Sequence, residues 1–171
     1  MDAVRSNPDI TKFHFGDFNC DADYHGKYLG KVIMDSKSLT ELEINACTFL
    51  HPKAFFEMCS PLLQAKNNLK VLKMKGILIT LVEAKVIQFI MMKNKNLETM
   101  DFTECIDEDM TNFKVFFQKL DSNNNIKYLT LDGMEPGLST CIEALGDALG
   151  KNKKLEVLNM KKNRIKMTNY C

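Results

Sequence analysis

No apolar run in this 171-residue sequence approaches the roughly 18 residues that a membrane-spanning helix needs. The residues that follow Met1 lack the hydrophobic stretch of a signal peptide. There is also no C-x-x-C motif and no N-x-S/T glycosylation site. Together these absences predict a protein of a reducing compartment, with the cytoplasm as its location.

The motifs of common enzymes are missing too. There is no Gly-rich phosphate loop, no G-x-S-x-G elbow and no paired-carboxylate motif. Only three histidines are present, His14, His25 and His51, and none belongs to a recognisable ligand or base motif. Cys20 lies five residues before His25, a spacing that allows a metal pair or a thiol-base couple, yet no further ligand is near them in sequence. We therefore predict that the chain is not an enzyme and that it holds no cofactor, metal or catalytic residue.

Charge and hydrophobic content set further bounds. The formal net charge is +1 and 45% of the residues are hydrophobic, so the chain has enough apolar material for the core of one domain. A near-neutral chain lacks the strongly basic surface that a nucleic acid would bind. Nucleic acid is therefore disfavoured as a partner.

What the sequence does contain is a pattern that returns six times. Each copy reads L-x-x-L-x-L-x-x-(C/N/apolar), and the spacings between copies are 29, 30, 28, 29 and 29 residues. We call the six copies units 1 to 6; they open at Ile10, Leu39, Leu69, Leu97, Ile126 and Leu155. The fourth and sixth positions alternate with polar residues, which is typical of a short strand with one buried face. A fixed period of this length predicts stacked supersecondary units.

Between these strands lies a second apolar pattern with helical spacing, as in Phe55, Cys59 and Leu62. Pro52 fits the first turn of the helix in unit 2. Asp107 or Asp109 is the expected N-cap of the helix in unit 4. Each unit is thus predicted to be a strand, a loop, a helix and a loop.

This pattern resembles the leucine-rich repeat, and the spacing with Cys or Asn at the ninth position is similar to its ribonuclease-inhibitor subclass. The resemblance implies an α/β solenoid with a curved parallel sheet on the concave face and helices on the convex face. It divides the chain into a lead-in at 1–9, a repeat domain at 10–165 and a tail at 166–171. Cys47 and Cys105 would occupy the buried ninth position.

The resemblance also points to the concave face as the binding surface. At the second position of successive units the residues are Thr11, Thr40, Lys70, Glu98, Lys127 and Glu156. At the fifth position they are His14, Glu43, Lys73, Asp101, Thr130 and Asn159. Opposite charges on neighbouring strands predict lateral ladders, which either neutralise a solvated face or form a mixed-charge docking surface. The predicted partner-binding residues are Lys70, Lys73, Lys75, Glu98, Asp101, Glu104, Lys127, Tyr128, Asp132, Glu156, Lys161 and Lys162.

The two ends of the repeat domain carry no recognisable capping segment. Solenoids normally need capped ends, so we expect a protein partner or a second copy to cover them, unless the chain is part of a longer protein. The last unit is also strongly basic, with Lys151, Lys153, Lys154, Lys161, Lys162, Arg164 and Lys166 against the single acid Glu156. This cluster either attracts an acidic protein surface, a nucleic acid or an anionic membrane, or keeps an edge strand from pairing with another chain.

We therefore predict a non-enzymatic protein-protein interaction module, a scaffold subunit of a larger intracellular assembly. Among relatives of this repeat class, a cytoskeletal or ciliary axonemal scaffold best fits a short, uncapped, mixed-charge arc. Two alternatives stay open. One is a regulator of a small GTPase, similar to the Ran GTPase-activating protein, although the loop arginine and the acidic tail typical of that family have no match here. The other is a fragment of a longer leucine-rich repeat sensor.

Overall fold

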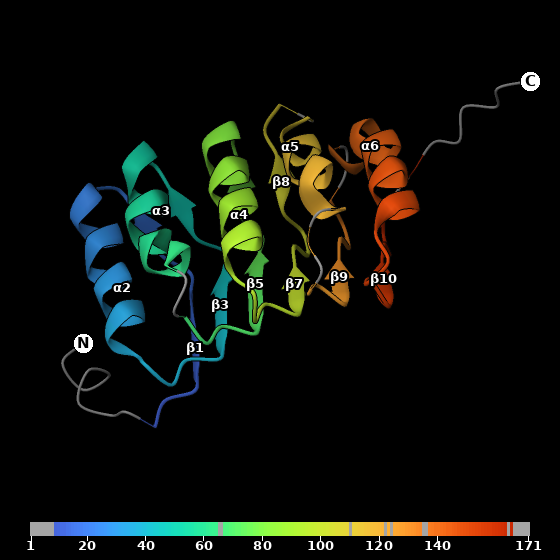
Figure 1. Cartoon of the computed structure of the whole chain (residues 1–171). Coiled ribbons are helices and arrows are strands. Elements are labelled where there is room, and N and C mark those ends of the chain that lie inside the picture. Colours follow the sequence, from blue (N-terminus) through green and yellow to red (C-terminus); the bar gives the residue numbers. More distant parts are fainter. Residues whose placement is uncertain are drawn as a thin grey trace, which may run out of the picture.

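Short strands and helices alternate along the chain (Figure 1). The structure is a computed structural model, and it describes residues 9–64, 67–109, 111–121, 123, 125–134, 137–163 and 165. The strands of the main sheet are β1 (Lys12–Gly16), β3 (Glu41–Asn45), β5 (Val71–Lys75), β7 (Thr99–Asp101), β9 (Tyr128–Thr130) and β10 (Val157–Asn159). The helices are α2 (Asp23–Asp35), α3 (Pro52–Cys59), the short 3-10 helix η1 (Ser60–Leu63), α4 (Leu81–Lys93), α5 (Asn112–Leu120) and α6 (Gly137–Lys151). Four two-residue strands lie between them: β2 (Asn19–Cys20), β4 (Thr48–Phe49), β6 (Leu78–Ile79) and β8 (Ile106–Asp107).

The main sheet is parallel, and its six strands follow the order β1-β3-β5-β7-β9-β10. A helix connects each strand to the next, as parallel pairing requires. The register joins equivalent positions of neighbouring units: Leu42 of β3 pairs with Phe13 on one side and with Leu72 on the other. Figure 1 shows the helices in one row and the sheet strands in another, with β1 and β10 at opposite ends. The sequence prediction of an α/β fold with a parallel sheet is confirmed.

The core fills the space between the sheet and the helices. Leucine, isoleucine and methionine side chains from the fourth and sixth positions of the inner strands are buried completely, as at Leu42, Ile44 and Met100. Aromatic rings add to them in the middle of the row, where Phe102 lies 5.2 Å from Phe113 between ring centroids. The fourth and sixth positions, which the sequence pattern predicted to form the buried face of each strand, are therefore the ones that the fold buries.

Helix starts follow local sequence signals. Helix α3 begins at Pro52, as predicted. Helix α4 begins after a capping box, in which Thr80 Oγ1 accepts from the backbone of Val82 (3.1 Å) and Glu83 accepts from the Thr80 backbone (3.1 Å). For α5, the predicted acceptor Asp107 binds two backbone N–H groups of the first turn, at 3.0 and 3.1 Å, although the residue directly before the helix is Thr111.

Two sets of hydrogen bonds join neighbouring units. In the first, a buried asparagine donates from Nδ2 to a carbonyl near the end of the preceding helical segment, at 2.7, 2.8 and 2.7 Å. These asparagines are Asn94, Asn123 and Asn152. They satisfy carbonyls that the end of a helix leaves without an intrahelical partner.

In the second set, a residue with a positive φ follows each sheet strand. These residues are Asp17, Ala46, Gly76, Glu104, Gly133 and Lys162, with φ between 47° and 68°. The backbone N–H of each of the first five donates to a carbonyl of the next unit at 2.7 to 3.0 Å. The left-handed turn therefore recurs in every unit, although glycine, the residue that adopts it most easily, occupies only two of the six positions.

None of the helices in the described ranges has the length and the apolar character that crossing a bilayer requires.

Candidate functional site

The face of the main sheet that points away from the buried residues carries the third- and fifth-position side chains of the units, and we call it the open face. Side chains alternate along a strand, so these two positions share one side of the sheet. The third-position residues are Lys12, Glu41, Val71, Thr99, Tyr128 and Val157. The fifth-position residues are His14, Glu43, Lys73, Asp101, Thr130 and Asn159.

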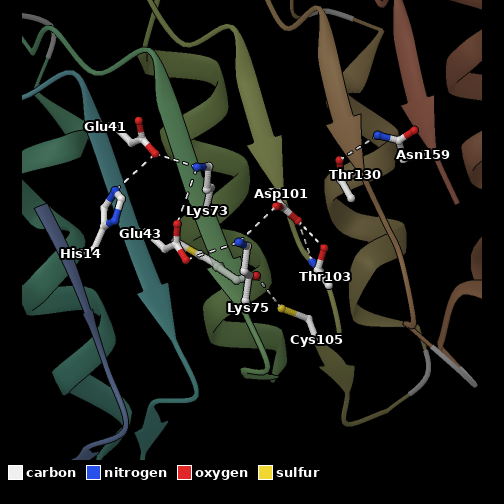
Figure 2. A network of polar contacts seen from close by, with 11 residues as sticks. His14, Glu41, Glu43, Lys73, Lys75, Asp101, Thr103, Cys105, Thr130 and Asn159 are labelled. Carbon is white, nitrogen blue, oxygen red and sulfur yellow. Dashed lines mark hydrogen bonds and ion pairs between the residues drawn. The ribbon is translucent and has the colours of Figure 1, made fainter. Parts of the chain in front are cut away.

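Glu41 is the centre of a charged network on β1, β3 and β5. Lys73 Nζ donates to Glu41 Oε1 at 2.6 Å, and Lys12 Nζ lies 3.2 Å from Oε2. His14 Nε2 lies 3.2 Å from Oε1. The Glu41 side chain is only 10% exposed, so three neighbours from two adjacent strands almost enclose it. Figure 2 shows its contacts with His14 and Lys73.

The network continues along the fifth-position row. Lys73 Nζ also lies 3.6 Å from Glu43, and Lys75 bridges Glu43 (3.3 Å) and Asp101 (3.8 Å). Asp101 Oδ1 in turn accepts from the backbone and hydroxyl of Thr103, at 2.9 and 2.6 Å. Figure 2 shows these contacts running from β3 through β5 to β7. Acids and lysines thus alternate, and each lysine is already held by carboxylates of the same chain.

These contacts shift two pKa values. The hydrogen bond from Lys73, helped by Lys12 and opposed by burial, lowers the pKa of Glu41 from 4.5 to about 2. The same hydrogen bond raises the pKa of Lys73 above its ordinary value. Both groups are therefore charged near neutral pH, and a carboxylate with so low a pKa is a weak proton acceptor.

The part of the open face on β9 and β10 has no charged side chain at the third and fifth positions. Tyr128 and Val157 pair in register and are 41% and 40% exposed. Thr130 and Asn159, the next pair, are joined by a 3.4 Å contact between Asn159 Nδ2 and Thr130 Oγ1. This uncharged half offers an aromatic ring and an aliphatic side chain side by side, next to the charged half.

The predicted second-position ladder is only partly present. Lys127 Nζ lies 3.3 Å from Glu98, but no ion pair links Lys70 or Glu156 to this row in the described part of the chain. The second position precedes the start of each strand, so its side chains lie at the edge of the sheet rather than on the open face. The predicted fifth-position ladder is present between Glu43 and Lys73, while Asp101 pairs with Lys75 instead.

The remaining predicted residues lie beyond the strands. Glu104 and Lys162 occupy left-handed turn positions and are 4.0 Å apart. Asp132 Oδ1 accepts from the backbone N–H of Lys161 at 2.6 Å. These four residues are therefore turn residues along one edge of the open face. Tyr128 was the one third-position residue among the predicted contacts. Sequence reasoning followed the second and fifth positions, so it missed the other third-position residues, Lys12, Glu41, Val71, Thr99 and Val157.

One group of potential metal ligands occurs among the described residues, and it lies inside the network. His14, Glu41 and Glu43 offer ligand atoms within 4.8 Å of one another. The ammonium group of Lys73 already contacts both carboxylates, at 2.6 and 3.6 Å. A metal cation would have to displace or repel this charge, so the arrangement favours an ion-pair network over a metal centre.

The cysteines in the described part of the chain are poor nucleophiles. Cys20, Cys47, Cys59, Cys105 and Cys141 are all buried thiols. Burial raises the pKa of each of them, to about 11 at Cys20 and about 12 at Cys105. The thiolate that a nucleophile or a metal ligand needs is therefore disfavoured.

Cys20 and His25 do not form the thiol and base pair that their sequence spacing allowed for. His25 Nδ1 lies 2.9 Å from Asp21, and no group of ligands in the described ranges includes Cys20.

The basic cluster lies at the β10 end of the sheet. Lys151 ends α6, and the other four described lysines, Lys153, Lys154, Lys161 and Lys162, are exposed around β10. Arg164 and Lys166 lie outside the described residues, as do 1–8 of the predicted lead-in and the whole predicted tail.

No known family model matches this sequence. Comparison with curated proteins also yields no match.

Proposed function

We propose that this chain is a non-enzymatic protein-binding module of the leucine-rich repeat class, acting as a scaffold subunit of a cytoplasmic assembly, and that it binds a protein partner with the open face of its sheet. The repeat assignment is supported by the constant period. Paired strands and left-handed turns recur at spacings of 28 to 30 residues, and so do the buried asparagines Asn94, Asn123 and Asn152, which we call the ladder asparagines. A cytoskeletal or ciliary setting stays a prediction from the sequence resemblance.

The observation that carries the binding proposal is the pair Tyr128 and Val157. An aromatic and an aliphatic side chain stand next to each other, each about 40% exposed, at the β10 end of the third-position row on the open face. Tyrosine supplies a large apolar contact area and a hydroxyl, which is why it concentrates binding energy at interfaces.

The charged half of the open face supports specificity rather than affinity. Glu41, Glu43, Lys73 and Lys75 are held by one another in one arrangement, so a partner meets a fixed pattern of alternating charge. Such a pattern orients a partner and rejects those with the wrong charges. A partner with a complementary row of charges and an apolar group placed over Tyr128 fits this surface.

The absence of activity is supported by the chemistry of the candidate groups. The carboxylate of Glu41 is a weak base, and the described thiols are buried with raised pKa values. Glu41 and the described thiols are thus poorly suited to act as a base or a nucleophile at neutral pH.

The test is site-specific photo-crosslinking in the cells that make this protein. A benzophenone amino acid replaces Tyr128 in one variant and Phe89 of α4 in the control. Phe89 is the more exposed of the two, at 50% against 41%, so nonspecific capture would favour the control. We expect a discrete crosslinked product from position 128 that is absent from position 89, and its loss when Val157→Asp is added.

Equal products from both positions, or none from position 128, would contradict binding by the open face. Circular dichroism of the Val157→Asp chain establishes that the fold is retained, since Val157 is 40% exposed and fills no closed part of the core.

A further inference from the structure

The two outer edges of the main sheet present complementary backbone groups. In the described residues, β1 and β10 each pair on one side only. Within the sheet, a left-handed residue donates its N–H to the carbonyl just before the next left-handed residue, as Gly133 does to Lys161 at 2.9 Å. At the β10 edge the equivalent donor is Lys162, and at the β1 edge the equivalent acceptor is the carbonyl of Gly16.

In the described part of the chain, a second ladder also leaves a free acceptor at one edge and a free donor at the other. Val157 N donates to Lys127 O at 2.9 Å, and each earlier unit repeats this contact. The next acceptor in the series would be the carbonyl of Glu156 at one edge, and the next donor would be Lys12 N at the other. A strand placed beside β10 in parallel, with the register of β1, would therefore continue both ladders.

The apolar side chains at the two edges match in the same register. Paired positions run from Phe13 in β1 to Leu158 in β10, and the equivalent row in the next layer runs from Phe15 to Met160. These four end residues are only partly buried, whereas their equivalents in the inner strands are completely buried. Contact between the two ends would complete the burial of both rows.

At the β1 end the surface is also hollowed. A cavity of about 330 Å³ is lined by the aromatic rings of Phe13, Phe15 and Phe18, together with Tyr28 and Leu29 among others. The cavity is open and apolar, and it lies where an additional unit would place its own core residues. Leu158 and Met160 at the opposite end are side chains of a suitable size and character.

Charge at the two ends has opposite sign. Residues 151–163 contain five lysines and one glutamate, whereas residues 9–23 contain four aspartates and one lysine. The continued register would put Lys162 beside Asp17, since both occupy the left-handed turn position. Both side chains are exposed, and Lys162 makes a 4.0 Å contact with Glu104.

We propose that two copies of this chain associate head to tail, with the β1 edge of one copy added to the β10 edge of another, and with Lys162 of one copy paired with Asp17 of the next. This surface is separate from the open face, so the inference does not rest on the proposed function. The contact is heterologous and leaves a free edge at each end, so it builds open chains as concentration rises.

The test is sedimentation velocity of the full chain from about 1 μM to about 1 mM, the range in which a weak interface becomes occupied. We expect the average mass to rise with concentration at low salt, and to rise less in about 1 M salt, where exposed ion pairs are screened. The exchange of charges supplies the specific check. Asp17→Lys and Lys162→Asp, made singly, place like charges together and should weaken association on the order of tenfold.

The double variant, Asp17→Lys with Lys162→Asp, restores opposite charges and should recover association. Both residue types already occur at this left-handed turn position in the fold, which keeps the backbone cost of the exchange small. Lys85→Asp on α4, exposed and far from both edges along the sheet order, is the control and should leave association unchanged.

A mass that stays at 19.6 kDa over the whole range overturns the proposal. The proposal is also overturned if the single variants associate as strongly as the wild type, or if the double variant does not recover association. In either case the contact between copies would lie elsewhere. Binding of an acidic protein or a nucleic acid to the lysine end without self-association would assign that end to a different partner.

Discussion

Replacing Glu41 with glutamine removes one charge from the centre of the network while keeping its shape. In the folded protein the pKa of Glu41 is lowered from 4.5 to about 2, mainly by the hydrogen bond from Lys73. A lowered pKa means that the charged carboxylate stabilises the fold at pH values above 4.5. That stabilisation is lost as the pH falls from 4.5 toward 2, where the carboxylate takes up a proton.

The size of the effect follows from the contacts. A fall in pKa from 4.5 to about 2 corresponds to at most about 3 kcal/mol of unfolding free energy. The Glu41 side chain is 10% exposed, but that of Lys12 is 66% exposed, and solvent screens its part of the interaction. We therefore expect Glu41→Gln to lower the unfolding free energy by about 1 to 2 kcal/mol at neutral pH.

Urea unfolding followed by circular dichroism measures the unfolding free energy of both proteins at about pH 7 and about pH 3. More than half of the free-energy difference between wild type and variant should be lost at the lower pH. Glu98→Gln is the matched control. Its ion pair with Lys127 has the same chemistry, but both side chains are more than 40% exposed, so the cost should stay below about 0.5 kcal/mol. A difference for Glu41→Gln that is the same at both pH values would refute the linkage argument.

Three further predictions concern the turns, the asparagine ladder and the thiols. Gly76→Ala should lower the unfolding free energy by about 1 kcal/mol because φ is +58°, whereas Ala46→Gly at the equivalent turn should raise it slightly; urea midpoints decide both. Asn123→Ala should lower the unfolding free energy by about 2 to 3 kcal/mol, and Asn94→Ala should lower it by less. The Asn123 side chain makes three hydrogen bonds to the backbone, whereas Asn94 donates from Nδ2 but accepts none at Oδ1. Urea titrations of the two variants measure the difference. Cys105, with a pKa of about 12 and a buried sulfur, should resist iodoacetamide in the folded protein and react in denaturant, as peptide mapping by mass spectrometry can show.

The period of the apolar pattern was enough to predict the strands, the helices and their parallel arrangement. The fourth and sixth positions are buried because burial of one strand face imposes a period of two, which a sequence displays directly. The start of α3 at Pro52 and the role of Asp107 before α5 were also predictable, because both depend on backbone groups only a few residues away.

The candidate site was less predictable. The sequence interpretation placed the second and fifth positions on one face, but positions that share a strand face differ by an even number of residues. The strands begin at the third position, so Glu41 rather than a second-position residue meets Lys73. The choice between Lys73 and Lys75 as the partner of Asp101 depends on side-chain reach, which no spacing reveals.

The asparagines and the left-handed turns differ in how clearly the sequence marks them. The ladder asparagines stand at a constant interval of 29 residues and could have been recognised from the sequence. The left-handed turn could not, because Asp17, Ala46, Glu104 and Lys162 share no side-chain property there. Their conformation is imposed by the hydrogen bond that each turn makes to its neighbour and not by the residue itself.

Those hydrogen bonds between neighbouring units also determine how the molecule would respond to tension. Load applied between β1 and β10 would pass through every lateral ladder in series, and an end unit, bonded on one side only, would give way first. Each unit that opens would release about 29 residues, or roughly 100 Å of extended chain, while the remaining units stay folded. A row built in this way would lengthen in steps under force and shorten again as the units re-form, so that a protein proposed to hold others together could also absorb strain between them.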